Sequence, residues 1–155
     1  MANRFMQQAI EESLQGMRSG DGGPFGAVIT QNGEIIASAH NEVLKTNDPT
    51  AHAEIAAIRR AAEKLGRFDL SDCEIYSSCE PCPMCLSAIY WAKISMLHYG
   101  NTAKDAADAG FDDQFIYDAI RGNVANKRIT ILAEDREDCK IAFDEWNAKI
   151  DKTTY

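Results

Sequence analysis

Three thiols lie close together in the stretch "SSCEPCPMCLSAIYWAK", where Cys79, Cys82 and Cys85 occupy every third position. Such a cluster suits a redox pair with a spare thiol, part of a disulfide framework, or a set of metal ligands. Pro81 and Pro83 favour a helix that begins at about Pro81, because proline is tolerated in the first helical turn. Cys82 and Cys85 then lie one turn apart on one helical face, and Cys79 lies before the helix, near the end of a strand.

A histidine could complete a metal site, and the sequence contains three of them, His40, His52 and His98. His52 lies in the first turns of a second predicted helix that, like the cysteine helix, follows a strand. If the two helices begin side by side at one edge of a sheet, His52 approaches Cys82 and Cys85. Two thiolates and an imidazole suit zinc, and three protein ligands leave a fourth position for water.

The residues around this trio leave alternatives open. Cys79 could close the site as a fourth ligand of a structural zinc; its position outside the helix argues against this, but spacing alone does not decide. Glu54 follows His52 by two residues and so lies on another helical face, where it is a poor ligand but could accept a proton from bound water. A thioredoxin-like redox pair at Cys82 and Cys85 is the rival interpretation, although it gives no reason for the sequence "HAE".

The composition predicts one soluble, cytoplasmic domain. The chain has 155 residues, of which 45% are apolar, enough for a single core. No segment has the run of about 18 uncharged apolar residues typical of a membrane span, and the first residues lack the pattern of a signal peptide. A reducing compartment disfavours disulfides among the five cysteines. The net charge of −8 repels phosphate backbones, so nucleic acid is not an expected partner. Without a membrane span, a membrane is not expected either.

The hydrophobic pattern predicts elements in the order α-β-β-α-β-α-β-α-β-α. Helices are expected over 3–17, 47–66, 81–93, 112–122 and 135–150, and strands over 25–30, 34–40, 73–78, 94–100 and 128–134. "QNG" between the first two strands is a hairpin signal. An opening hairpin followed by alternating strands and helices predicts an α/β fold with a mixed five-stranded sheet and helices on both faces.

Two helices carry signals at their ends. Asn3 suits the N-cap of the first helix. In the second helix Asp48 suits the N-cap, Pro49 the first helical position and Gly66 the residue after the last turn.

Two motifs connect the sequence to a known family. "HAE" at 52–54 and "PCPMC" at 81–85 match the H-x-E and P-C-x-x-C signature of the zinc-dependent nucleobase deaminases, which the chain therefore resembles. The order of elements is similar to the three-layer α/β/α cytidine-deaminase-like fold over most of the chain. The stretches "GGPFGAVI", "NDPTAHAE", "SSCEPCPMCLSAIYWA" and "DAADAGFDDQFIY", with a C-terminal tyrosine, resemble bacterial guanine deaminases.

The resemblance implies a zinc-dependent hydrolase that converts guanine to xanthine and ammonia. It assigns zinc to His52, Cys82 and Cys85, and makes Glu54 the group that shuttles protons.

The resemblance also implies how the purine is held. Asn41, Phe25, Trp91 and Asp113 resemble the residues that contact the base, and Tyr155 resembles a terminal residue that closes the pocket. In that family the C-terminal segment, here about 135–155 of a single 1–155 domain, can cross to the partner subunit, which implies a swapped homodimer.

Each substrate residue also has a purely structural explanation. Phe25 and Trp91 suit a core, Asn41 a loop cap, Asp112 or Asp113 a helix N-cap, and Tyr155 a frayed end; Cys73, Cys79 and Cys139 are interpreted as structural. Other functions also share the zinc motifs: a tRNA adenosine deaminase, a cytosine or cytidine deaminase, or a non-catalytic module in which zinc only stabilises a binding domain.

Overall fold

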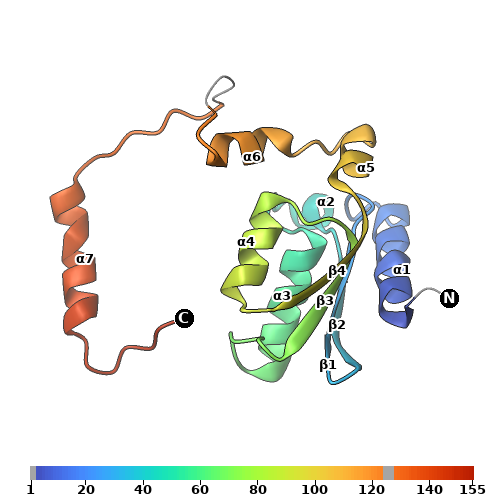
Figure 1. The fold of residues 1–155 in the computed structure, drawn as a ribbon, viewed down its shortest axis with the longest axis horizontal. Coiled ribbons are helices and arrows are strands. Elements are labelled where there is room, and N and C mark those ends of the chain that lie inside the picture. The colour runs from blue at the N-terminus through green and yellow to red at the C-terminus, as the bar shows by residue number, and fades with distance from the viewer. Residues whose placement is uncertain (1–2, 124–127) are drawn as a thin grey trace.

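A computed structural model describes residues 3–123 and 128–155 of the chain (Figure 1). Within these residues the strands form one mixed four-stranded sheet in the order β2-β1-β3-β4. Its strands are β1 (Gly26–Gln31), β2 (Glu34–His40), β3 (Cys73–Cys79) and β4 (Met96–Asn101). β1 is antiparallel to β2 and to β3, and β4 is parallel to β3. The hairpin predicted from "QNG" is thereby confirmed.

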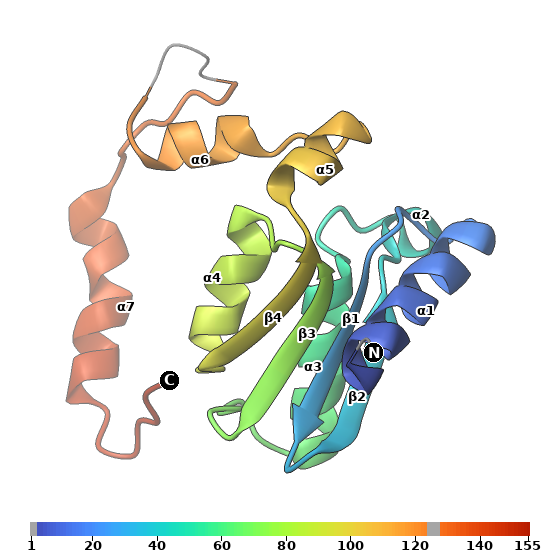
Figure 2. The same cartoon turned by 45° about the vertical axis from the view of Figure 1, so that its right-hand side comes forward.

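Helix α1 (Arg4–Arg18) covers one face of the sheet (Figure 2). Its predicted N-cap is confirmed, because Asn3 Oδ1 accepts a hydrogen bond of 2.9 Å from the Phe5 backbone N–H. Ala9 packs against Val28 and Tyr76 to form a small core on this side.

Helices α3 (Ala53–Leu65) and α4 (Pro83–Trp91) cover the opposite face, which gives the three layers that the pattern predicted (Figures 1 and 2). Ala53, Ala57 and Ala61 recur at every fourth residue of α3 and are fully buried. Their small side chains let the helix approach the sheet closely, where it packs in one cluster with Ile29 and Ile75.

Both of these helices begin later than predicted. Asp48 does not cap a helix; its carboxylate accepts bonds from the backbone N–H and the hydroxyl of Thr50, which fixes a local turn. The α3 helix therefore starts at Ala53 with His52 at the N-cap, after the short helix α2 (Val43–Thr46). Likewise α4 starts at Pro83 with Cys82 at the N-cap. Gly66 ends α3 with φ of 66°, as predicted.

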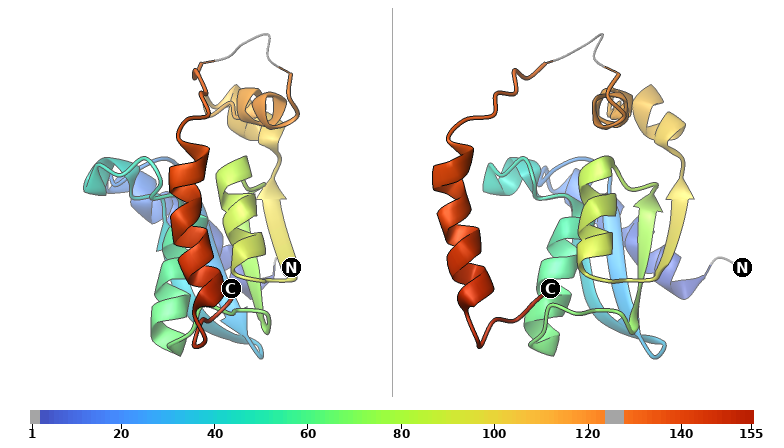
Figure 3. Two further views of the ribbon diagram at one scale, coloured as in Figure 1. Left: turned by 90° about the vertical axis from the view of Figure 1, so that its left-hand side faces the viewer. Right: turned by 60° about the vertical axis from the view of Figure 1, so that its left-hand side comes forward.

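The predicted fifth strand is wrong. After β4 the chain forms α5 (Ala103–Asp108) and α6 (Gln114–Ile120), and residues 128–135 then run without strand structure to α7 (Arg136–Ala148). Figure 3 shows α7 standing apart from the sheet. A strand needs a neighbouring strand for its backbone hydrogen bonds, and this segment is carried away from β4. Its apolar side chains are consequently open to solvent, as Ile131 with 84% of its surface exposed illustrates.

None of the helices in the described part of the chain combines the length and apolar character that crossing a bilayer would demand.

Candidate active site

The sheet topology brings several predicted site residues to one edge. Because β1 is antiparallel to both neighbours, its first residues lie beside the ends of β2 and β3. Gly26 pairs with His40, and Ala27 pairs with Ser77. The residues that precede β1 and follow β2 and β3 therefore meet at this edge, where α3 and α4 also begin.

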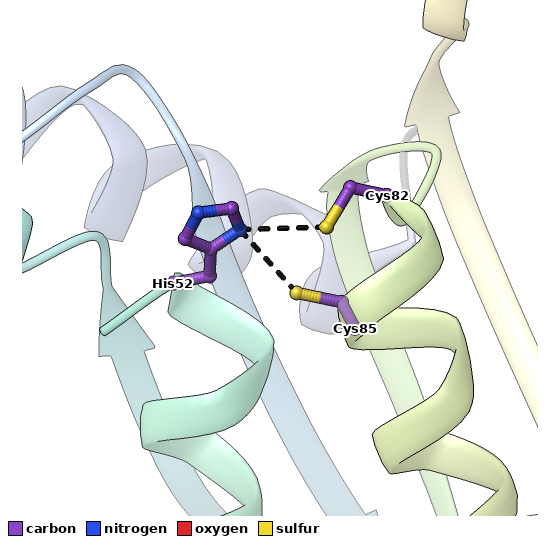
Figure 4. Close-up of side chains that lie close together, drawn as sticks. All are labelled: His52, Cys82 and Cys85. Carbon is purple, nitrogen blue, oxygen red and sulfur yellow. Dashed lines mark hydrogen bonds between the residues drawn. The ribbon is translucent and has the colours of Figure 1, made fainter. Parts of the chain in front are cut away.

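The three predicted metal ligands converge at the N-termini of those two helices (Figure 4). His52 is the N-cap residue of α3, Cys82 is the N-cap residue of α4, and Cys85 follows in the first turns of α4. His52 Nδ1 lies 3.6 Å from Cys82 Sγ and 3.5 Å from Cys85 Sγ. All three ligand atoms lie within 4.8 Å of one another.

These distances fit a tetrahedral zinc site. With zinc bonds of about 2.3 Å to sulfur and about 2.0–2.1 Å to nitrogen, tetrahedral geometry places the sulfur and nitrogen atoms about 3.5 Å apart. The Cys79 thiol is engaged elsewhere, since its Sγ donates to the Thr102 carbonyl at 3.7 Å. Among the described residues the metal-ligating group comprises His52, Cys82 and Cys85. The chain thus supplies three ligands, the number typical of catalytic zinc sites with one open position.

The neighbours of Cys82 within this trio favour its deprotonated, thiolate form. Hydrogen bonds from Cys85 and then from His52 lower the pKa of Cys82 to about 4. The same proximity to Cys82 raises the pKa of His52 and raises the pKa of Cys85. Two helix N-termini point their backbone N–H groups at this region, which also favours an anionic sulfur.

Glu54 lies beside the trio as a buried carboxyl group. It belongs to the first turn of α3 and has only 5% of its surface exposed. Ser77 Oγ on β3 donates a 2.9 Å hydrogen bond to Glu54 Oε1. Burial raises the pKa of Glu54, so this carboxyl group holds a proton more readily than an exposed glutamate does. The sequence did not single out Ser77, because a serine within a strand carries no signal of its distant partner.

A cavity of about 760 Å³ opens over these groups. Its lining includes the site residues His52, Glu54 and Cys82 together with the predicted substrate residues Phe25, Asn41 and Asp113. The lining is mostly apolar with a few polar groups, which is typical of sites for small planar ligands.

Two aromatic side chains and two polar side chains of the lining could contact a ligand in the cavity. Phe25 and Phe111 pack edge to face with centroids 4.9 Å apart, and form an aromatic wall. Asn41 Oδ1 accepts the Val43 backbone N–H at 3.1 Å, so the amide nitrogen of Asn41 remains available as a donor. Burial raises the pKa of Asp113. Phe111 was not predicted, although it lies within the quoted motif "GFDDQF".

The two aspartates differ in what they do locally. Asp112 Oδ1 accepts the Gln114 backbone N–H at 2.9 Å, and so stabilises the turn that enters α6. Asp113 occupies the N-cap position without a capping hydrogen bond from its side chain. Asp113 is therefore the aspartate whose carboxyl group is free to meet a ligand.

Two predicted substrate residues lie outside this cavity. Trp91 ends α4 at the far end from Cys82 and has 67% of its surface exposed. Tyr155 packs near it, with ring centroids 6.2 Å apart, and near Phe68 at 6.1 Å. Trp91 lies at the end of α4 that points away from the cavity, and the C-terminal segment places Tyr155 beside it. Within one chain neither residue therefore lines the cavity.

The family comparison agrees with this geometry. Residues 1–101 match the model of the "Cytidine and deoxycytidylate deaminase zinc-binding region". The chain is 45% identical to guanine deaminase of Bacillus subtilis (strain 168) over 151 residues, which covers 97% of both proteins. The crystal structure of guanine deaminase from Bacillus subtilis superposes with a TM-score of 0.93 and covers 100% of this chain and 99% of that one.

Other relatives match a smaller part of the chain. A guanine deaminase structure from Nitrosomonas europaea has a TM-score of 0.67 and 34% identity over 70% of this chain and 63% of that one. A tRNA-specific adenosine deaminase of Agrobacterium fabrum is 44% identical over 102 residues, which are 64% of this chain and 66% of that protein. The family model matches residues 1–101, and the three residues that could hold a zinc ion lie within that range. The chain therefore belongs to the cytidine and deoxycytidylate deaminase zinc-binding family.

Proposed function

We propose that the protein is a zinc-dependent guanine deaminase that hydrolyses guanine to xanthine and ammonia. The observation that carries this assignment is the likeness to a guanine deaminase over 97% of both chains, joined to a buried glutamate beside a three-ligand metal site. The tRNA deaminase quoted above matches only 64% of the chain, and the net charge of −8 suits a polyanionic substrate poorly.

His52, Cys82 and Cys85 would hold the zinc ion. When bound, zinc acidifies a water molecule and so supplies the nucleophile of a hydrolytic deamination. Glu54 takes up one proton of the water at its buried carboxyl group and delivers it to a ring nitrogen of the base. It then takes up the second proton of the same water and delivers it to the amine as the carbon–nitrogen bond breaks and ammonia leaves. The hydrogen bond from Ser77 holds the Oε1 oxygen of this carboxyl group in place.

The cavity walls would select the base. The Asn41 amide nitrogen donates to an acceptor on the purine, and the aromatic wall of Phe25 and Phe111 packs on the ring. Asp113 as a carboxylate accepts hydrogen bonds from N–H groups that guanine has and that adenine and cytosine lack at the same edge.

Ammonia release from zinc-replete protein tests the assignment. We expect turnover of guanine, and much lower turnover of adenine, cytosine, cytidine and a tRNA stem-loop that contains adenosine. A preference for the stem-loop would instead support the tRNA adenosine deaminase, and a preference for cytosine or cytidine the pyrimidine alternative. No turnover of any base would favour the non-catalytic module.

A second copy of the chain would cover the C-terminal segment. Residues 128–155, which include this segment and the stretch that leads to it, expose the apolar side chains Ile129, Ile131, Leu132, Ile141, Phe143 and Ile150. The body of the protein exposes a complementary set, Tyr90, Trp91, Met96 and Tyr99. Soluble monomers rarely expose patches of this extent, which supports a homodimer in which this segment crosses to the partner. Tyr155 of the partner subunit would then complete the substrate site, a role that Tyr155 does not fill within its own chain.

Size measurement by light scattering tests the dimer. We expect about twice the 17.1 kDa of one chain, and a shift toward the monomer in Phe143→Asp, because a carboxylate is costly to bury at an apolar interface. Asn147→Asp on the same helix is the matched control and should remain dimeric. Deletion of Tyr155 should leave the dimer intact and raise KM for guanine. A wild-type protein that remains monomeric at high concentration contradicts the proposal.

The five cysteines are free thiols, which supports assignment to a reducing, cytoplasmic compartment.

A further inference from the structure

A buried histidine outside the metal centre bridges two carboxylates. His40 ends β2 and has 7% of its surface exposed. Its Nδ1 lies 2.9 Å from Glu12 Oε2 on α1, and its Nε2 lies 2.9 Å from Asp21 Oδ2 in the loop that follows α1. A neutral imidazole donates from only one nitrogen, whereas an imidazolium donates from both. Two carboxylate acceptors therefore select the positively charged form of His40.

Two further cations lie around this bridge, and one of them, Lys45, shares Asp21 with His40. Lys45 at the end of α2 lies 3.2 Å from Asp21 Oδ2 and 3.7 Å from Glu42 Oε1. Arg60 on α3 lies 2.9 Å from the same oxygen of Glu42. Glu42 is thus shared by two cations, and His40 is the cation that faces both Glu12 and Asp21.

The balance of these interactions favours the proton on His40. Burial on its own lowers the pKa of this imidazole. The hydrogen bonds to Glu12 and Asp21, with the nearby negative charges, outweigh burial and raise the pKa of His40 above its ordinary 6.5. The bond to His40 in turn lowers the pKa of Asp21.

The ring of His40 has little freedom to move. It packs on α1 at Gly16, where an added Cβ would lie 2.5 Å from its Cδ2 atom. The helix therefore accepts the ring only because residue 16 has no side chain, and the two ring nitrogens are held toward their acceptors.

The bridge is connected to the wall of the cavity. The Asp21 carbonyl accepts the backbone N–H groups of Leu44 and Lys45, both at 3.0 Å, and so anchors α2. Gly22, which follows Asp21, lines the cavity and contacts Asn41 so closely that an added Cβ would lie 2.1 Å from Asn41 Oδ1. Asn41 itself follows His40 in the chain.

We propose that His40, as an imidazolium between Glu12 and Asp21, is a positioning residue that holds the cavity wall carrying Asn41 in the shape that binds the base. The proposal rests on the deaminase function proposed above. Because Glu54 and the metal ligands come from other elements, loss of the bridge should weaken substrate binding more than it slows turnover.

The expected pH dependence of KM follows from the direction in which folding moves the pKa of His40, which is upward. A histidine whose pKa is raised by folding keeps its favourable interactions below the unfolded value of about 6.5, and loses them as pH rises through the folded value. KM for guanine should therefore be low and constant on the acidic side, and should rise as His40 loses its proton.

Substitution of His40 by glutamine is the central test. His40→Gln keeps one N–H donor but no charge, so KM should rise about tenfold below the His40 pKa, in line with the loss of a charged hydrogen bond. The change in kcat should be smaller, and the rise of KM with pH should disappear. Glu12→Gln removes one negative charge from the bridge and should move that rise to lower pH. His98→Gln is the matched control, since His98 also faces a glutamate, Glu74 at 3.2 Å, but does not line the cavity.

Two results would overturn the proposal. One is a folded, zinc-replete His40→Gln enzyme with the KM and pH profile of the wild type. The other needs no variant: in an NMR titration of the wild-type protein, His40 should carry protons on both nitrogens at pH 6.5, and a neutral His40 at that pH contradicts the bridge. Failure of the wild type to deaminate guanine would count against the proposed function alone, because the titration does not depend on turnover.

Discussion

Glu54→Gln is expected to lower kcat for guanine by about 10²–10⁴-fold, the range of a positioned acid–base group. Glutamine has the shape of glutamate and can still accept the Ser77 hydrogen bond, but it neither takes up nor delivers a proton. Since Glu54 is not one of the three ligand residues, zinc content should stay near one ion per chain. Steady-state kinetics together with metal analysis of the same preparation measure both quantities.

A matched control separates this effect from a general change on the helix. Glu63→Gln alters an exposed glutamate of the same helix, α3, and should leave kcat and KM close to the wild type. Near-normal turnover of a zinc-loaded Glu54→Gln protein would remove Glu54 from the mechanism, and with it the hydrolytic assignment.

Removal of the metal is expected to abolish deamination entirely. The three ligands supply the whole protein contribution to the site among the described residues, so Cys85→Ser should lose both zinc and turnover. In the wild type, chelation should abolish ammonia release and added zinc should restore it.

The same experiment has a thermodynamic readout. An ion that binds only the folded state stabilises it by about 2.7 kcal/mol when its free concentration is one hundred times Kd. Zinc should therefore raise the Tm of the wild type and leave that of Cys85→Ser unchanged. Cys139→Ser alters an exposed thiol and should behave as the wild type in both assays. Full turnover by protein shown to be metal-free would refute the role of the site.

Much of the protein followed from local sequence signals. The "QNG" hairpin, the Asn3 cap and the Gly66 helix end depend on the conformational preferences of a few neighbouring residues, so the sequence sufficed to predict them. The zinc ligands were predicted for a related reason. Helix starts and strand ends could be placed well enough to bring "HAE" and "PCPMC" to one edge, where the distances between the side chains fit a single ion.

The errors occurred where a residue's role depends on a distant partner. The segment 128–134 has the composition of a strand, but a strand forms only beside another strand, and the fold carries this segment away from the sheet. The assignment of Trp91 and Tyr155 to the substrate is not one of these errors and stays a prediction: in one chain the two residues lie near each other outside the cavity. The helix start at Ala53 was missed because the side chain of Asp48 makes a turn where a cap was expected.

By itself, then, the sequence predicted the layered α/β architecture and the three residues that the structure brings together as a possible metal site, because spacing and periodicity encode them locally. The role of Glu54 as proton shuttle stays a prediction that the resemblance supplied. Only the tertiary structure decided that Ser77 holds Glu54 and that His40 joins Glu12 to Asp21. These contacts join residues that are 19 to 28 positions apart in the chain. A hydrogen bond over such a separation depends on how the helices and the sheet pack, which no short pattern of residues specifies.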